Sequence, residues 1–307
     1  MRRVVLVGAG GFLGSHARAA LARSGSELTL TCVDRCPRPP GRGDWRALDV
    51  LAAQPGTLAE LIGELRPDVV VNCAGLLAGD LAALAACNVL LVARLLDAIA
   101  GAAPGVRLVH LGSAAEYGVV EGAGNIAEDE PTAPVSAYGI LKLAATQLIA
   151  RRHAEGALEA IVLRVFNPVG AGLSHHTVLG RAACLMRQAS RDGAPRIDLG
   201  DLSAVRDFVP AADVGEAVAR ACTCAPTADV VFNVGSGVAR SVRDMVASLA
   251  AVAGYRGAIG ELSAGSPRSG AIGGQAADVG RARRAFAWTP SPDPTDALRA
   301  LWRATGA

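Results

Sequence analysis

Residues 3–14 read RVVLVGAGGFLG, and the fold class follows from this stretch. An apolar run of strand length leads into a glycine-rich turn, and an alanine-rich segment of helical character follows it. Glycines at Gly8, Gly11 and Gly14 let the backbone turn tightly and approach a ligand, and the amide-rich start of a helix favours negative charge. The GxxGxxG spacing between a strand and a helix therefore predicts a turn that holds the pyrophosphate of a dinucleotide.

The alternation of strand and helix continues along the first half of the chain. Short apolar runs at 28–34, 68–75, 107–113 and 159–166 are separated by alanine-rich segments of helix length. Such a pattern predicts right-handed βαβ units, and hence an α/β fold with a doubly wound parallel sheet covered by helices on both faces.

After Phe166 the pattern loosens. We expect a helix near 177–191, a strand at 230–235, a helix at 242–253 and a loop or lid at 257–275, which is rich in Gly, Ser and Pro. These expectations divide the chain into a dinucleotide-binding domain and a smaller, discontinuous C-terminal substrate lobe above the carboxyl ends of the strands. The expected bounds are 1–166 plus 204–237 for the domain, and 167–203 plus 238–307 for the lobe.

Composition narrows the classes of function. The 307 residues are 51% hydrophobic and 19% charged, which indicates a folded globular protein, and the net charge of +2 is too small for a nucleic-acid binder. Seven cysteines without paired spacing predict free thiols in a reducing cytoplasm and no metal site. The apolar run 81–100 is interrupted by Asn88, Arg94 and Asp97, so we expect a helix inside the protein and no membrane span.

Asp34 ends the second predicted strand, twenty residues after Gly14. A carboxylate at this position accepts hydrogen bonds from an adenosine ribose and repels a 2′-phosphate, which favours NAD. Arg35, Arg38 and Arg42 follow closely, and an arginine there can grip the extra phosphate, so NADP remains possible.

The chain has a single lysine, Lys142, among 30 lysine and arginine residues, and it lies four residues after Tyr138. On a helix, positions i and i+4 share one face. An ammonium beside a phenol stabilises the phenolate, so we expect a lowered pKa and a role for Tyr138 as proton donor or acceptor. Ser113 ends the predicted strand 107–113 at the ligand-binding edge of the sheet, where its hydroxyl could hold a substrate oxygen.

These motifs together resemble the extended short-chain dehydrogenase/reductase superfamily, in its branch of nucleotide-sugar epimerases, dehydratases and 4-ketoreductases, with a Rossmann fold. The resemblance covers nearly the whole chain and rests on GAGGFLG, NCAG, SAAEYG, YGILK, LRVFNPVGAG, VRDFVPAADV, FNVGSG and FAWTP. It implies that Ser113, Tyr138 and Lys142 are catalytic. It implies cofactor contacts for Gly8, Gly11, Phe12, Leu13, Gly14, Asp34, Arg35, Asp49, Val50, Ala74, Gly75, Asn88, Tyr138 and Lys142, and substrate contacts for Ser113, Ala114, Ala115, Asn167, Arg206 and Arg268.

Departures from the family's patterns select among its activities. Ala114 and Ala115 stand where 4,6-dehydratases carry an acidic pair, and Val169 stands where 4-epimerases commonly carry tyrosine. The resemblance therefore implies NAD(P)-dependent chemistry at carbon 4 of a nucleotide-activated sugar, with a 4-ketoreductase slightly ahead of a 4-epimerase that holds its NAD tightly. A non-catalytic NAD(P) sensor, or an enzyme acting on a small hydroxy acid or polyketide, stays open. The family's habit of pairing two helices per subunit implies a homodimer through 81–103 and 135–153.

Overall fold

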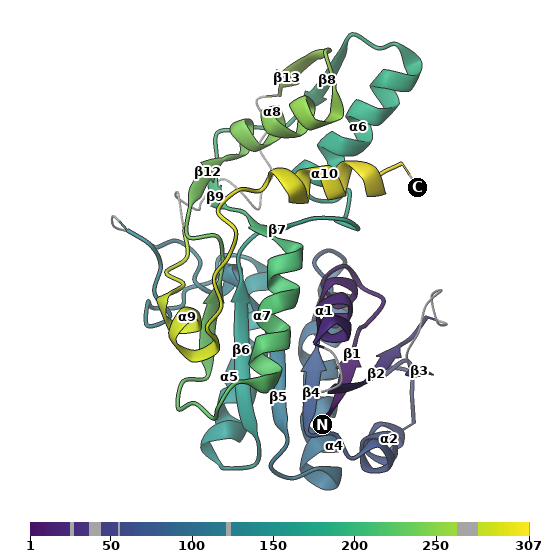
Figure 1. Ribbon diagram of the computed structural model, residues 1–307, viewed down its shortest axis with the longest axis vertical. Coiled ribbons are helices and arrows are strands. Elements are labelled where there is room, and N and C mark those ends of the chain that lie inside the picture. The colour runs from purple at the N-terminus through teal and green to yellow at the C-terminus, as the bar shows by residue number, and fades with distance from the viewer. Residues whose placement is uncertain (25–27, 37–43, 55, 121–123, 263–275, 307) are drawn as a thin grey trace.

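The computed structural model describes residues 1–24, 28–36, 44–54, 56–120, 124–262 and 276–306, built around a seven-stranded parallel sheet (Figure 1). Its strand order is β11-β6-β5-β4-β1-β2-β3. The strands are β1 (Arg2–Val7), β2 (Leu28–Asp34), β3 (Asp44–Ala47), β4 (Val69–Asn72), β5 (Arg107–Ser113), β6 (Glu159–Val165) and β11 (Val231–Val234). The order of strands along the chain reverses between β1 and β4, so the loops that follow these two strands run in opposite directions. Doubly wound sheets bind ligands at this point of their carboxyl edge. The predicted fold class is confirmed.

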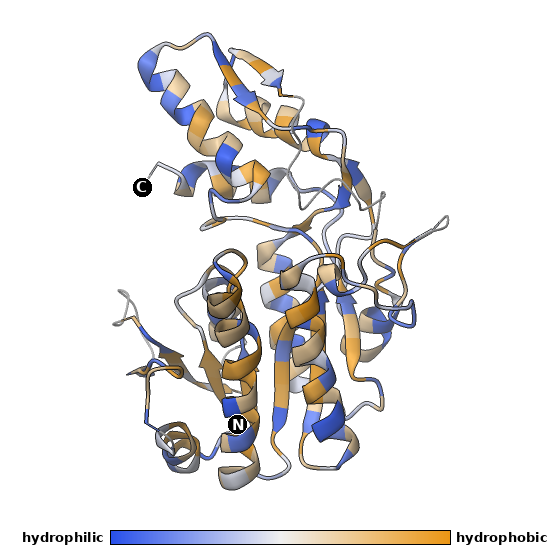
Figure 2. Ribbon diagram, turned by 180° about the vertical axis from the view of Figure 1, so that it is seen from behind, coloured by the Kyte–Doolittle hydropathy of each residue, from blue (hydrophilic) through white to orange (hydrophobic). Residues whose placement is uncertain are grey.

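Helices cover both faces because the strands bury alternate side chains on either side. Val4 and Leu6 of β1 pack with α1 (Phe12–Arg23) and α7 (Ala211–Thr223). Val5 and Val7 pack on the opposite face. That face is covered by α2 (Thr57–Leu65), α4 (Leu91–Ala102) and α5 (Ala137–Ala154). Figure 2 shows the same strands as largely apolar ribbons between these helices. This burial on two faces explains the continuous apolar runs in the sequence.

A smaller lobe stands above the carboxyl edge of the sheet (Figure 1). It has its own apolar cluster, which includes Leu179, Met186, Leu249 and Leu298. Its elements are α6 (Val178–Asp192), α8 (Val242–Ala253), α10 (Thr295–Ala304), β8 (Arg196–Leu199) and β13 (Ala258–Glu261). Two short strand pairs lie between lobe and sheet, namely β7 (Pro168–Val169) with β10 (Val209–Pro210), and β9 (Val205–Asp207) with β12 (Ala239–Ser241).

Two details differ from the expected lobe. Residues 276–288, which include the whole of α9 (Gly280–Phe286), contribute Ala277, Phe286 and Trp288 to the apolar cluster of the sheet, so this part of the chain returns to the dinucleotide-binding domain. In addition, the expected loop at 257–275 contains β13, which pairs in parallel with β8. The rest of that segment, 263–275, lies outside the described residues.

The predicted helix at 81–100 is one run, Leu81–Ala102. It comprises α3 (Leu81–Ala85), a π-helical turn (η2, Ala86–Leu90) and α4. Within the described residues this run alone is long and apolar enough to cross a membrane, and 44% of its most apolar window is buried. The run packs against α2 and α5, as a core helix of a layered fold does. Leu81 and Leu90 nevertheless stay exposed.

Candidate active site

The turn after β1 has the shape that the glycine spacing predicts. Gly8 has φ +77°, a conformation that favours glycine, and its carbonyl accepts a 3.1 Å hydrogen bond from the Gly11 amide. A Cβ on Gly14 would overlap that carbonyl, and a Cβ on Gly8 would lie 2.6 Å from the amide nitrogen of Ala74 in the loop after β4. No side chain caps the start of α1 at Gly11. Helix amides and bare backbone therefore form a cradle suited to a pyrophosphate, with Phe12 and Leu13 in the first turn of α1.

Asp34 at the end of β2 lies against this turn. Its Oδ2 accepts a 2.9 Å hydrogen bond from the Gly10 amide, and its Oδ1 accepts a 3.0 Å bond from the Cys36 amide. A carboxylate has further acceptor capacity, so the position remains suitable for a ribose hydroxyl. Arg35 is exposed beside it, whereas Arg38 and Arg42 lie outside the described residues.

Asp49 and Asn88, which were also expected to contact the cofactor, hold two loops in place. Asp49 Oδ1 accepts from the amides of Leu51 (2.9 Å) and Ala52 (3.1 Å), which shapes the turn around the buried Val50. Asn88 is buried and donates to the carbonyls of Leu76 (2.8 Å) and Leu84 (2.9 Å). Asn88 thus ties down the loop that carries Ala74 and Gly75.

Ser113 and Tyr138 come together where β5 ends and α5 begins. The Ser113 side chain lies close enough to the Tyr138 phenol to lower its pKa. The backbone N–H of Ser113 donates to Glu116 Oε1 at 2.8 Å, while Ser113 Oγ accepts from the Ala115 amide at 3.2 Å. These reciprocal bonds cap the short 3₁₀ turn Ala114–Glu116 (η3) and hold the serine in place.

The electrostatics at Tyr138 differ from the expectation. Burial raises the pKa of Tyr138, the polar side chain of Ser113 opposes that rise, and the negative charge of Glu116 adds to it. The groups that shift this pKa do not include Lys142, and burial dominates because removing the phenolate from water disfavours it. Tyr138 is a phenol at neutral pH.

Lys142 is 4% exposed and directed at β5. Its Nζ donates to the carbonyl oxygen of Leu111 and lies 3.4 Å from His110 Nε2. Burial lowers the pKa of Lys142 to about 8, and the charges of Glu116 and Cys73 act in the opposite direction. Our reading of the sequence missed His110, although a polar residue inside the apolar run RLVHL was a signal for it.

Two of the three residues expected at the nucleoside diphosphate of the substrate lie between sheet and lobe. Asn167 follows β6 and donates to the Asp207 carbonyl at 2.8 Å. Arg206 in β9 is partly buried and donates to the Val205 carbonyl at 2.7 Å, and burial lowers its pKa. Arg268 lies outside the described residues.

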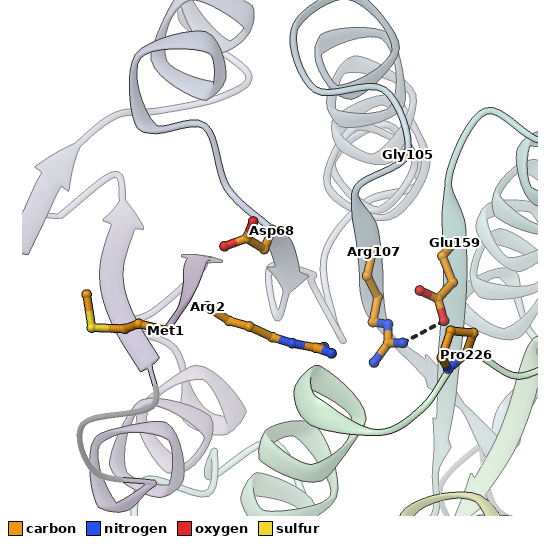
Figure 3. Close-up of a pocket in the computed structure, with 7 residues that line it drawn as sticks. All are labelled: Met1, Arg2, Asp68, Gly105, Arg107, Glu159 and Pro226. Carbon is orange, nitrogen blue, oxygen red and sulfur yellow. Dashed lines mark hydrogen bonds and ion pairs between the residues drawn. The ribbon is translucent and has the colours of Figure 1, made fainter.

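A cavity of about 370 Å³ lies at the opposite, amino edge of the sheet (Figure 3). In it, Arg107 forms a 2.7 Å ion pair with Glu159 and donates to the carbonyls of Ala221 and Cys224 at the end of α7. These bonds engage both terminal nitrogens of the guanidinium and hold α7 to the sheet. The cavity is remote from Ser113, which lies at the carboxyl edge of the sheet.

Among the residues that the structure describes, no group of three or more His, Cys, Asp or Glu side chains is arranged to hold a metal ion.

Comparisons with known proteins agree with this geometry. The model of the NAD dependent epimerase/dehydratase family matches residues 4–235. The dTDP-6-deoxy-L-talose 4-dehydrogenase (NAD(P)(+)) of Kitasatospora kifunensis is 36% identical over 304 residues, covering 98% of this chain and 95% of that protein. The GDP-6-deoxy-D-mannose reductase of Pseudomonas aeruginosa is 30% identical over 261 residues, covering 82% and 80%. The solved structure of MoeE5 in complex with UDP-glucose and NAD superposes with a TM-score of 0.83 at 29% identity, covering 99% of this chain and 98% of that one.

Proposed function

The chain belongs to the NAD dependent epimerase/dehydratase family, and from that premise we propose that it is an NAD(P)-dependent 4-ketoreductase acting at carbon 4 of a nucleotide-activated sugar. The observation that carries the proposal is the proximity of Ser113 to Tyr138 at the carboxyl edge of β5, with Lys142 one helical turn further along α5. The 4-dehydrogenase and reductase names of the two relatives support it.

The glycine cradle fits the cofactor because its bare backbone leaves room for phosphates and none for side chains. Gly8, Gly11 and Gly14 would hold the pyrophosphate, and Asp34 would hold the adenosine ribose, with Arg35 available for a 2′-phosphate. When bound, the nicotinamide supplies or accepts the hydride. Asp34 favours NAD over NADP, and the NAD(P)(+) of the first relative's name is compatible with either.

The raised pKa of Tyr138 suits reduction. A phenol that keeps its proton at neutral pH can donate it to O4 as the carbonyl becomes an alkoxide. The Ser113 hydroxyl would hold the same oxygen, since it lies close to the phenol. Tyr138 would thus act as the general acid, and Ser113 would orient the substrate.

Asn167 and Arg206 would bind the nucleoside diphosphate between sheet and lobe, with Arg268 as a further candidate. A guanidinium suits a pyrophosphate because its planar fork can make two parallel bonds. Ala114 and Ala115 would border the sugar, and neither can act as an acid or base. Elimination of water is therefore not expected.

The competing activity is a nucleotide-sugar 4-epimerase, which would use Tyr138 twice, first as base and then as acid. An epimerase regenerates its NAD in each cycle and should purify with it, whereas a reductase exchanges cofactor at each turnover. Absorbance of the supernatant after denaturing the purified protein separates the two. A non-catalytic NAD(P) sensor would not need Tyr138 at all.

We further propose that the protein is a cytoplasmic homodimer with no nucleic-acid or membrane partner. Exposed apolar side chains line the two adjacent helical runs at 81–102 and 137–154, namely Leu81, Leu90, Ile140 and Leu148. Covering them with a second copy would pair the helices of the two subunits.

Replacing Tyr138 with phenylalanine tests the function directly. Because general acid catalysis contributes about 10²- to 10⁴-fold, kcat for reduction of a 4-keto sugar nucleotide should fall by that factor in Tyr138→Phe. NAD should still raise the melting temperature of the variant in a thermal-shift measurement. UDP, GDP and dTDP are then added in turn, to find which nucleoside diphosphate raises it further. Unchanged kcat would overturn the role given to Tyr138. Wild-type protein that binds NAD but reduces none of these sugars would favour the sensor, and no response to any nucleoside diphosphate would point to a substrate without a nucleotide.

A further inference from the structure

Three buried polar side chains form a line behind Ser113. Asn72 ends β4, His110 lies within β5, and Lys142 reaches them from α5; all three are at most 4% exposed. Asn72 Nδ2 lies 3.1 Å from His110 Nδ1, and His110 Nε2 lies 3.4 Å from Lys142 Nζ. Buried polar groups must find partners, so the position of each proton in this line is constrained.

The direction of the hydrogen bonds follows from Asn72. The amide N–H of Ala74 donates to Asn72 Oδ1 at 3.0 Å, which leaves the Nδ2 group of Asn72 facing His110. An amide NH₂ can only donate, so His110 Nδ1 must accept. Burial lowers the pKa of His110 well below its usual 6.5, so the ring is neutral and carries its one proton on Nε2. That N–H is directed at Lys142 Nζ.

We propose that His110, oriented by Asn72, is a positioning residue that points a hydrogen-bond donor at Lys142, one helical turn after Tyr138, and thereby favours the unprotonated amine. An ammonium at this place would set two donors against each other, whereas a neutral amine accepts from His110 and still donates to the Leu111 carbonyl. The charge of the lysine then changes within the neutral to mildly alkaline range.

The other groups that face Lys142 act in known directions. Burial has the largest effect and also favours the neutral amine, while the charge of Glu116 from η3 and the thiol of Cys73 after β4 favour the ammonium. Tyr138, one turn earlier on the same helix, is an uncharged phenol at neutral pH. His110 therefore acts together with burial against Glu116.

The consequence for catalysis rests on the proposed function. An ammonium within reach of the phenol would stabilise the phenolate, the form that accepts a proton from a sugar alcohol, and a neutral amine would leave the phenol the proton that it donates to a ketone. The line from Asn72 to Lys142 thus favours the proton-bearing form of Tyr138.

The single lysine of the chain makes a direct test possible. Protein labelled with ¹³C at lysine Cε gives one side-chain resonance, whose titration reports the pKa of Lys142. The wild-type midpoint is expected near 8, and His110→Phe should move it upward by about 0.5–1 unit, the equivalent of one lost hydrogen bond. His153→Gln is the matched control, because His153 is hydrogen-bonded at the far end of α5, and it should leave the midpoint unchanged. A midpoint that stays or falls in His110→Phe would overturn the proposal, since it would mean that Nε2 accepts from an ammonium.

A second measurement needs no substitution in the line. ¹⁵N shifts of the wild-type histidines should show His110 with a protonated Nε2 and an unprotonated Nδ1 between pH 6 and 8, and a protonated Nδ1 would refute the assignment. Both measurements use protein without sugar or dinucleotide. Failure of the proposed enzymatic activity would therefore leave their result interpretable.

Discussion

Glu116 shows how much one buried carboxylate can organise. Its Oε1 accepts from the Ser113 amide at 2.8 Å, and its Oε2 accepts from Arg164 Nε at 2.8 Å. The guanidinium of Arg164 also stacks on Tyr117, 4.5 Å from the ring centre. Glu116 therefore fixes the serine that faces Tyr138 while its own charge is compensated from β6.

Removing this carboxylate should destabilise the protein strongly. Glu116→Ala leaves the buried charge of Arg164 uncompensated, which costs about 3–5 kcal/mol of unfolding free energy. Glu155→Ala removes the exposed pair between Arg151 and Glu155 and should cost at most about 0.5 kcal/mol. Urea unfolding of both variants measures the difference, and equal losses would contradict the role given to Glu116.

At the scale of elements, the turn between β1 and α1 depends on close contacts that only glycine permits, because it has no Cβ. Gly14 in the first turn of α1 faces the carbonyl of Gly8, and Gly8 faces the backbone of Ala74 after β4. The strand, the turn and the neighbouring loop are therefore packed backbone against backbone. This packing keeps the phosphate cradle narrow.

Adding a methyl group at Gly14 should separate these elements. Gly14→Ala is expected to cost about 1–3 kcal/mol through overpacking and to abolish the thermal shift caused by NAD. Gly63→Ala in α2 is the control, since its Cβ would meet only Ala102 at the ordinary distance of 3.7 Å, and it should be neutral or stabilising by up to about 1 kcal/mol. An undiminished response to NAD in Gly14→Ala would disprove the cradle.

For the whole molecule, Asp207 joins the sheet domain to the segments that lead into the lobe. Its Oδ1 accepts from the amide and hydroxyl of Ser236 (2.6 and 2.7 Å), and its Oδ2 accepts from the amides of Gly237 (2.9 Å) and Ala277 (3.0 Å). The side chain is fully buried. Asp207 thus fixes β9, which carries Arg206, against two later parts of the chain.

Asp207→Asn should loosen this junction, because the new NH₂ group faces backbone donors. We expect a loss on the order of 3 kcal/mol in unfolding free energy and a weaker response to nucleoside diphosphate than to NAD. Asp198→Asn, at an exposed pair with Arg196, should cost less than about 1 kcal/mol. Thermal shifts with each ligand compare the two, and equal weakening of both ligands in Asp207→Asn would argue against a local effect on the lobe.

The assembly is also a property of the whole molecule. Ile140→Arg places a charge on the exposed apolar face of α5, where Ile140 is 54% exposed, and should convert the proposed homodimer to a folded monomer. Arg151→Glu, a charge change at the far end of the same helix, should leave the mass unchanged. Sedimentation velocity measures both, and a wild-type monomer would rule out the proposed dimer.

Local pattern sufficed for the larger elements. The bounds of β2, β5 and α8 agree with the predicted ranges, since each is a run of apolar or alternating residues long enough to show its period. The short strands β3, β7, β9, β10 and β12 were missed, because two to four residues carry no period and their pairing depends on partners distant in the sequence.

The glycine spacing, the order of strands and helices, and the Tyr138–Lys142 spacing were readable from the residues because they depend on neighbours within a few positions. The protonation states at the site could not be predicted from the sequence. They depend on burial and on groups that folding brings together, such as Asn72 beside His110 and Glu116 beside Arg164. Desolvation raised the pKa of Tyr138 where local reasoning expected a fall, because the cost of burying a charge is set by the surrounding protein and not by the adjacent sequence.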